Sequence, residues 1–468
     1  MLIANADDYR VLVDTFSEVR VVLNCTGPFR FLGKDIVAAC IAARSNYLDI
    51  CGEPQFMEQS FYDNDDEARK NGCLILHACA FDSVPADLGC LFAMNQYGPD
   101  KCSSIESFLI INCPKGLAGH YTTYESAVYG VGDVKKLKKV RNEIVAKYKP
   151  PPLQSVGPAL HLKSSTYYYE PRVEKYAMPF KGADVSVVRG SQRSVSIREG
   201  KLIWPQYNAY VCLDSQYYAA SSAVYGGVFA TMASFSVGRS ILLQFPKVFS
   251  DGVFSKAGPT AEQLEETSFD MYFFASGYND ETDPNPQLMA ETGVDDSEIK
   301  LTNELEGKKK SRIKPSDLAP TVMGKAGCSV LFPGVSSNGS GTNGSGSAPP
   351  PALDKFIRTV VSGPEPGYIA TPAILVTLAL IVLEDRSSLP NGGVMTPSSC
   401  FYSYPRVFDK LNSAGIYFRV VNEVVSLSKE ELEYQETDES AFNQPIAVVD
   451  ATIMPSIVDD LAEAESKD

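Results

Sequence analysis

The amino-acid sequence predicts an α/β fold, in which a parallel sheet with helices on both faces is followed by a mostly antiparallel α+β region. Over roughly the first 115 residues, short apolar runs alternate with stretches whose apolar residues recur at helical spacing. That alternation is typical of a parallel sheet. From about residue 104 to 290 the strand-like runs become aromatic-rich and adjoin a polar, lysine-rich stretch. This change of pattern favours a second region with antiparallel pairing.

Three strands alternate with three helices in the first region. Each predicted strand is a compact apolar run that stops at turn residues, as buried parallel strands do. The strands are predicted at Val19–Asn24, Asn46–Ile50 and Cys73–Ala78. The helices are predicted at Asp35–Arg44, Gln55–Asn71 and Pro85–Asn95, and proline is tolerated at the start of the last one.

The remaining elements are predicted from the same patterns. Strands are expected at Ser104–Asn112, Asp184–Arg189, Gln206–Leu213 and Ile416–Val421, and helices at Gly130–Lys147 and Thr371–Glu384. Asp82 and Asp87 flank Pro85, and two interpretations are open for them. They are paired carboxylates, or Asp82 or Ser83 caps the helix at Pro85, which is the preferred interpretation.

A long uncharged stretch lies in the second region. Ser215–Gly238 contains 24 residues and no Asp, Glu, Lys or Arg. Serine, threonine, glycine, glutamine and tyrosine interrupt it, so it is less apolar than a full membrane span. A buried or interfacial helix is therefore preferred over a true span.

Composition and charge exclude some classes of function. The chain has 468 residues and a net charge of −15. The stretch from Lys429 to Asp468 holds twelve acidic residues and two lysines, so −10 of that charge sits in the tail. Binding to nucleic acid requires a basic surface, so no nucleic-acid partner is expected. The first residues, MLIANADDYRVLVDTF, show neither a secretory signal nor a transit peptide.

The cysteines and histidines predict no metal site. Eleven cysteines occur without a CxxC pair, and the histidines are His77, His120 and His161. These spacings do not match those of zinc ligands. Free thiols in a reducing, intracellular compartment are the expected state.

The turn after the first predicted strand is the most informative local motif. Asn24, Cys25, Thr26, Gly27 and Pro28 follow a buried strand, at the carboxyl edge where doubly wound sheets bind ligands. Glycine permits close approach to the backbone, and proline rigidifies the exit from the turn. A turn at a strand end with no ligand remains the alternative interpretation.

Several motifs read together resemble a known family. They are Leu23–Cys40 (LNCTGPFRFLGKDIVAAC), Tyr47–Glu58 (YLDICGEPQFME), Phe81–Gly89 (FDSVPADLG), Thr123–Asp133 (TYESAVYGVGD), Phe180–Arg193 (FKGADVSVVRGSQR), Lys247–Pro259 (KVFSDGVFSKAGP), Gly363–Pro372 (GPEPGYIATP) and Gly392–Pro397 (GGVMTP). In this order they are similar to the saccharopine dehydrogenase-like oxidoreductases, a family that includes the trans-acting enoyl reductases. The resemblance covers about 1–278 and 359–423.

The resemblance implies a fold, a cofactor and a location. The fold is a truncated Rossmann-type parallel sheet with an inserted α+β, mostly antiparallel domain. The cofactor is NADP or NAD, and Asn24, Cys25, Thr26, Gly27 and Pro28 would line it near the nicotinamide. Family members are associated with lipid droplets, membranes or mitochondria, and with lipid and glycolipid metabolism.

One departure from the family concerns the phosphate site. Relatives begin with a strand and a glycine-rich turn that opens a helix, and this sequence starts after that point. The turn's amide groups hold the pyrophosphate of the cofactor. The later run Gly339–Gly346 follows no predicted strand, so it is interpreted as linker.

These features lead to a predicted organisation. We expect a truncated dinucleotide-binding domain (1–103), an inserted substrate domain (104–278) with the apolar segment 215–238, a flexible insertion and linker (279–358), a C-terminal return onto the first domain (359–423) and an acidic disordered tail (424–468).

Two functions are compatible with this organisation. One is NAD(P)H-dependent reduction of a small-molecule or lipid substrate, impaired by loss of the glycine-rich turn. The other is a non-catalytic protein of a membrane or lipid-droplet surface, anchored by 215–238. The sequence identifies neither a proton donor nor an oligomeric state.

Overall fold

The computed structural model of the chain describes residues 8–81, 83–132, 134–164, 166–284 and 351–424. They belong to one unit, Met1–Val425. Residues 285–350 of the predicted linker and 425–468 of the predicted acidic tail lie outside the described residues.

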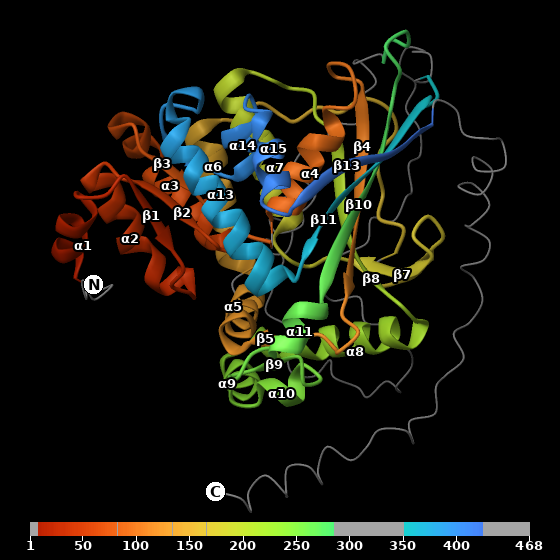
Figure 1. The fold of residues 1–468 in the computed structure, drawn as a ribbon, viewed down its shortest axis with the longest axis horizontal. Coiled ribbons are helices and arrows are strands. Elements are labelled where there is room, and N and C mark those ends of the chain that lie inside the picture. Colours follow the sequence, from red (N-terminus) through yellow and green to blue (C-terminus); the bar gives the residue numbers. More distant parts are fainter. Residues whose placement is uncertain (1–7, 82, 133, 165, 285–350, 425–468) are drawn as a thin grey trace, which may run out of the picture. The chain divides into compact units, whose positions relative to one another are not determined.

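The first of the two large sheets is parallel (Figure 1). Its strands are β1 (Val21–Asn24), β2 (Asn46–Asp49), β3 (Leu74–Leu76) and β12 (Gly393–Met395), in the spatial order β1-β2-β3-β12. All three pairings are parallel. Because β12 comes from the last described segment, the chain returns near its end to complete this sheet.

Helices cover both faces of the first sheet, since alternate strand residues point to opposite sides. Tyr47 and Ile75 pack with α1 (Tyr9–Phe16), α2 (Phe29–Ala43) and α3 (Pro54–Asn71). Leu48 and Leu76 pack with α4 (Val84–Met94) and α13 (Thr371–Glu384) on the other face. The first sheet is therefore the middle layer of a doubly wound arrangement.

The second large sheet has seven strands. Its strands are β4 (Cys102–Asn112), β6 (Tyr168–Glu170), β7 (Lys175–Pro179), β8 (Gln206–Leu213), β10 (Ser268–Gly277), β11 (Lys355–Pro364) and β13 (Tyr417–Val424), in the order β13-β11-β10-β4-β8-β7-β6. The β4–β8 pair is parallel and the other pairs are antiparallel. The predicted α/β fold, with a parallel sheet and a mostly antiparallel second sheet, is confirmed.

Further helices connect these layers. They are α5 (Tyr121–Gly132), α6 (Val134–Tyr148), α7 (Asp184–Glu199), α8 (Gln216–Ala233), α9 (Ser236–Gln244), α10 (Pro246–Phe249), α11 (Ala261–Glu266), α14 (Pro397–Phe401) and α15 (Arg406–Ser413). Shorter elements are β5 (Gly119–His120), β9 (Phe254–Ser255), η2 (Pro366–Ala370) and η3 (Arg386–Ser388).

One element prediction was wrong. Asp184–Arg189 is the start of α7 rather than a strand. The buried residues Val187, Val188, Ser191, Ser194 and Val195 recur at helical spacing, and the short alternating run at the start hid that longer period. The helix predicted at Gly130–Lys147 falls on α5 and α6, and Asp133 between them lies outside the described residues.

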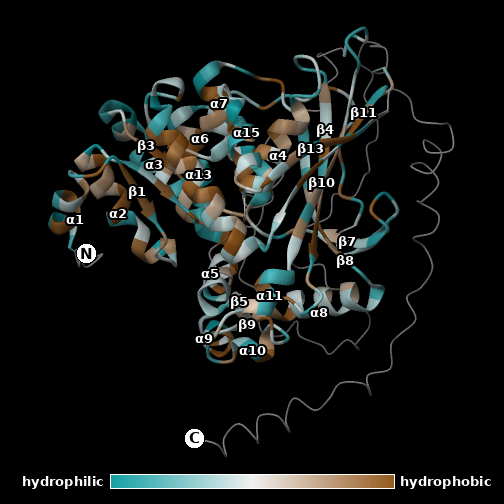
Figure 2. Cartoon of the chain, viewed as in Figure 1, coloured by the Kyte–Doolittle hydropathy of each residue, from teal (hydrophilic) through white to brown (hydrophobic). Residues whose placement is uncertain are grey.

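The helix formed by η2 and α13 is the most apolar one in the described part of the chain. Pro366–Glu384 is long and apolar enough to cross a membrane by length and composition, with a mean hydropathy of 2.0. Figure 2 shows α13 as hydrophobic along most of its length. Ile374, Leu378, Ile381 and Val382 are nevertheless buried against the first sheet and its neighbours. This burial gives α13 the position of a core helix.

The contact between α4 and β10 yields a stability prediction. A Cβ added at Gly89 of α4 would lie 2.3 Å from Cζ of Phe273, which is fully buried and has no room to move. We expect Gly89→Ala to lower the free energy of unfolding by about 1–3 kcal/mol. Urea denaturation measures the change.

A matched glycine provides the control. Gly226 lies within α8, and a Cβ there would meet no heavy atom within 4 Å. Gly226→Ala should leave stability unchanged or raise it by up to about 1 kcal/mol. Equal stability of Gly89→Ala and the unmodified protein would contradict this packing.

Candidate functional site

The carboxyl ends of the parallel strands meet at one edge of the first sheet. Asn24 ends β1, Asp49 ends β2, His77 follows β3 and Thr396 follows β12. Ligands bind at this edge in open sheets with helices on both faces. The four residues are brought together only by the strand order, since Thr396 lies far along the chain from the other three.

A buried carboxylate organises this edge. Asp49 is fully buried, and its Oδ1 accepts hydrogen bonds from the amides of Cys51 (3.1 Å) and Ala78 (2.9 Å). Its Oδ2 accepts from the hydroxyl of Tyr47 (2.9 Å) and lies 2.6 Å from Nδ1 of His77. A buried carboxylate is tolerated only when its oxygens are bonded in this way.

His77 is held at both ring nitrogens. Nδ1 faces Asp49, and Nε2 lies 2.8 Å from the hydroxyl of Ser60 on α3. His77 is almost fully buried, and its ring contacts Phe56 edge-on. Because both nitrogens have partners, His77 orients the strand ends and presents no free nitrogen to a ligand.

The same network shapes the turn after β1. Oδ1 of Asn24 accepts from the amide (3.0 Å) and the hydroxyl (2.6 Å) of Thr26, and its amide donates to Tyr47 (3.0 Å). Asn24 is therefore buried and shapes the loop, while Cys25 and Thr26 are exposed. Gly27 and Pro28, joined by a cis peptide bond, are half-buried.

Glu53 fastens the exit of this turn. The buried carboxylate accepts from the amide of Phe29 (2.8 Å) and pairs with the guanidinium of Arg30. Glu53 is the residue before α3, whereas Phe29 and Arg30 open α2. The starts of the two helices are thereby joined beside the turn.

Glycine at position 27 is not required by the rest of the described chain. Its φ is not in the left-handed region. A Cβ built on it would meet Phe29 at 3.6 Å and Thr122 at 3.8 Å, which are ordinary contacts. The missing side chain leaves the backbone open to a flat ligand, as the nicotinamide ring is.

The residues at this edge fit one part of a nicotinamide dinucleotide. Asn24, Cys25, Thr26, Gly27 and Pro28 offer an open backbone at the correct edge, beside β1, which pairs on one side only. The pyrophosphate requires amides from a glycine-rich turn at a helix start. The turns that follow the four described parallel strands contain no such sequence.

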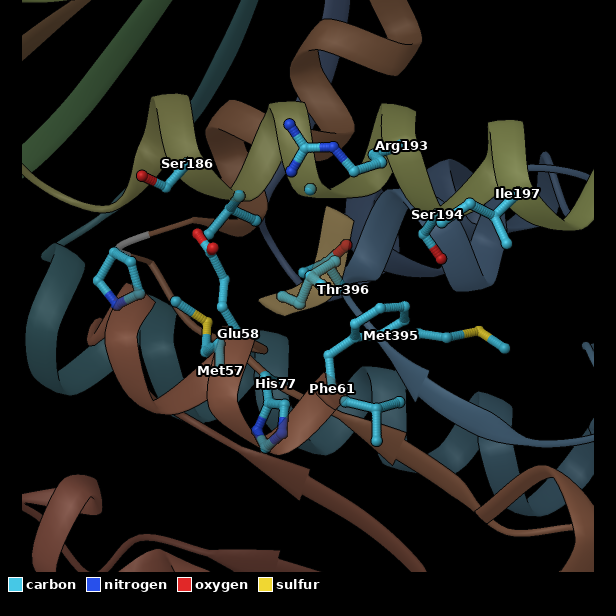
Figure 3. Close-up of a pocket in the computed structure, with 15 residues that line it drawn as sticks. Met57, Glu58, Phe61, His77, Ser186, Arg193, Ser194, Ile197, Met395 and Thr396 are labelled. Atoms are coloured by element: carbon cyan, nitrogen blue, oxygen red, sulfur yellow. The ribbon is translucent and has the colours of Figure 1, made fainter. Parts of the chain in front are cut away.

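A cavity of about 630 Å³, counting the part open to solvent, adjoins the same edge. Figure 3 shows α7 on one side and residues of α3 and His77 on the other. Its apolar lining comes from Met57, Phe61, Ile144, Val187, Ile197, Val394 and Met395, and its polar lining includes Glu58, His77, Ser186, Arg193, Ser194 and Thr396. Within it, the space open to the centres of water-sized molecules is about 70 Å³.

An ion pair joins the walls of the cavity. Glu58 of α3 accepts from Nε (2.9 and 3.1 Å) and Nη2 (2.7 Å) of Arg141 on α6. Arg141 also donates to the hydroxyl of Ser186 on α7 (3.2 Å). Three helices are thus fixed relative to one another by one guanidinium, whose planar donors suit a carboxylate.

The described thiols are free, and all except Cys25 and Cys113 are buried. Ten cysteines are described and none forms a disulfide, while Cys328 lies outside the described residues. Burial raises the pKa of Cys51 and Cys79, which flank Asp49, and the Asp49 charge raises both further. Within the described ranges no group of three or more His, Cys, Asp or Glu is placed to hold a metal ion.

The structure brings together residues that the sequence did not single out. Tyr47, Asp49, Glu58, His77 and Arg193 carry the polar chemistry of this edge, yet they lie on four different elements. One signal was available, because a charged residue at the end of a buried strand, as Asp49 is, requires partners.

Comparison with known proteins decides the family. No family model matches the chain. The saccharopine dehydrogenase-like oxidoreductase of Mus musculus is 34% identical over 426 residues, which cover 90% of this chain and 82% of that protein. This chain belongs to the saccharopine dehydrogenase-like oxidoreductase family.

More distant relatives carry names that refer to location. A probable mitochondrial saccharopine dehydrogenase-like oxidoreductase of Arabidopsis thaliana is 31% identical over 91% of this chain and 83% of its own length. A lipid droplet localized protein of Caenorhabditis elegans is 27% identical over 90% of this chain and 84% of its own.

Among solved structures, saccharopine dehydrogenase (L-Glu forming) of Saccharomyces cerevisiae aligns at 9% identity with a TM-score of 0.44, over 90% and 89% of the two chains.

In this family member, Asp87 of α4 fixes the wall of the cavity that contains Thr396. Its Oδ2 accepts from the hydroxyl of Ser191 on α7 and the amide of Ser398 on α14, both at 2.8 Å. Ser191 in turn lies 2.5 Å from the hydroxyl of Thr396. Ser83 occupies the N-cap position of α4 but its hydroxyl makes no capping bond, and Asp82, the other predicted cap, is not among the described residues.

The burial of Asp87 predicts a pH dependence. Burial raises its pKa to about 7, although the bonds from Ser398 and Ser191 lower it. Between about pH 4 and 7 the folded protein therefore holds a proton that the unfolded chain releases, so this contribution to stability falls as pH rises. Relative to Asp87→Asn, the wild type should lose up to about 1.4 kcal/mol per pH unit across that window.

Urea denaturation of both proteins from pH 4.5 to 8 measures this difference. Asp35→Asn, at an exposed position of α2, controls for the loss of an acidic residue. A stability difference between wild type and Asp87→Asn that does not change with pH would contradict the prediction.

Proposed function

We propose that this chain uses NAD(P)H to reduce an apolar small-molecule or lipid substrate. The observation that carries the proposal is the largely apolar cavity beside the carboxyl edge of the parallel sheet, where Asn24–Pro28 also lies. Membership of an oxidoreductase family supports it. The cavity is the place for the substrate, and the turn after β1 is the place for the nicotinamide.

Each part of the site has a distinct task in this proposal. The cofactor, when bound, supplies hydride. Cys25, Thr26, Gly27 and Pro28 would hold the nicotinamide end of the cofactor, and Asn24 keeps this turn in shape through Thr26 and Tyr47. The apolar side chains of the cavity exclude water from the reacting groups. The contacts of the site assign no proton donor.

Cofactor titration tests the proposal. NADPH or NADH should quench the fluorescence of Trp204 and the tyrosines with saturation in the micromolar range. Gly27→Ala should weaken that binding at least tenfold, about 1.4 kcal/mol, because the methyl group stands where the ring must approach the backbone. The melting temperature should not change, because the added Cβ makes only ordinary contacts.

Gly226→Ala serves as the control, because Gly226 lies on α8 outside the turn. No saturable binding at millimolar concentrations of either cofactor, from protein with a cooperative unfolding transition, would sink the proposal. A Gly27→Ala protein that binds as tightly as wild type would remove the turn after β1 from the site.

A second candidate function rests on α8 and α9. Along α8, which has 18 residues, only Ala219 and Ala233 are buried. Tyr217 is 76% exposed, Val224 58% exposed, and Val237 at the start of α9 65% exposed. Apolar side chains in an uncharged segment at the surface suit a lipid surface. A relative named as localized to lipid droplets supports this candidate.

Flotation with phosphatidylcholine vesicles tests the second candidate. Wild-type protein should rise with the vesicles. The double change Val224→Glu with Val228→Glu should abolish flotation, because both residues are exposed one turn apart on α8. Val134→Glu, at a residue 62% exposed on α6, is the matched control and should float. Wild-type protein that remains at the bottom would exclude a lipid-surface role for α8.

A further inference from the structure

The cavity contains a cation with no partner in the described part of the chain. Arg193 comes from α7 and lines the cavity (Figure 3). It is half-buried, and no described residue forms a hydrogen bond or ion pair with it. An arginine in this position has five N–H donors to offer and mostly apolar surroundings.

The nearest carboxylate does not satisfy Arg193. Glu58 raises the pKa of Arg193, but both its oxygens accept hydrogen bonds from Arg141. Burial lowers the pKa of Arg193, and the neighbouring positive charge of Arg141 lowers it further. Glu58, which lines the cavity, is paired with Arg141, so the charge of Arg193 in the lining is not offset by it.

The other titratable group in the lining does not alter this balance. His77 bonds Asp49 and Ser60 through its two ring nitrogens, so its polar atoms are already engaged. The chain as a whole carries a net charge of −15, which repels anions from the surface in general. An attraction for anions in this cavity is therefore local and depends on Arg193.

We infer that the cavity binds an amphiphile with an acidic head, a carboxylate or a phosphate, joined to an apolar chain. The head pairs with the guanidinium of Arg193, whose parallel N–H groups match two oxygens of such an anion. The apolar chain of the amphiphile lies against Met57, Phe61 and Met395, which line the same cavity. The identification of this amphiphile as the substrate rests on the proposed function. Its binding to the cavity does not depend on that function.

Calorimetric titration with octanoate, octyl phosphate and 1-octanol, without cofactor, tests the inference. Octanoate or octyl phosphate should bind saturably to the full chain, at least tenfold more tightly than octanol. Arg193→Met should remove that preference and leave octanol binding unchanged, because methionine retains the length of the side chain without the charge. Arg193→Lys should retain part of the preference.

Arg189→Met provides the matched control. Arg189 lies one turn earlier on α7, is exposed and does not line the cavity, so this variant should bind as the wild type does. Preference for octanoate identifies a carboxylate head and preference for octyl phosphate identifies a phosphate head. Equal affinity for octanol and both anions, or equal losses in Arg193→Met and Arg189→Met, would overturn the inference.

These outcomes are separable from those of the cofactor titration. Arg193-dependent binding of the anion by a chain that binds no NADPH would refute the proposed reduction and leave the anion site standing. Cofactor binding without any preference for the anions would refute only the anion site.

Discussion

The burial of one carboxylate is the constraint on which the site depends. Asp49 has no exposed surface, so its charge must be met by donors inside the protein. The donors come from the backbone after β2 and β3 and from Tyr47 and His77. The hydroxyl of Tyr47 also accepts a hydrogen bond from the amide of Asn24, which shapes the turn after β1. The geometry of the turn after β1 is therefore linked to the interior of the sheet rather than set by the turn alone.

A second buried carboxylate joins three elements that contribute residues to the cavity. Asp65 of α3 is fully buried; its Oδ1 accepts from the amide of Val394 in β12 (2.9 Å) and from Arg198 of α7 (2.8 Å). Helix α7 belongs to the segment inserted between β3 and β12 of the first sheet, yet it is bound to that sheet by charge-assisted bonds. These bonds hold α7 against α3 and β12, and residues of all three elements line the cavity. Such bonds are directional, so they fix position where apolar packing alone would tolerate sliding.

Each of the two candidate functions rests on a separate group of apolar side chains. The cavity hides apolar side chains from water beside the strand ends, whereas α8 and α9 present them to solvent. An enzyme that takes an apolar substrate from a lipid surface would use both. In the anion site that we infer, Arg193, which has no partner among the described residues, would orient a molecule that apolar contacts alone would leave free to turn.

The sequence by itself determined the α/β fold, the family and most elements. Gln206–Leu213 and Thr371–Glu384 have the predicted bounds, because a buried strand and a core helix each leave a strong periodic pattern. Asp184–Arg189 was misassigned because six residues are too few to separate the two periods, and packing against α4 and α14 decided for helix. Tertiary structure alone placed Glu58, His77 and Arg193 around one cavity and brought Asp49 against His77. Their contacts depend on strand order and on the return of β12, and partners so distant in the chain leave no local pattern in the sequence.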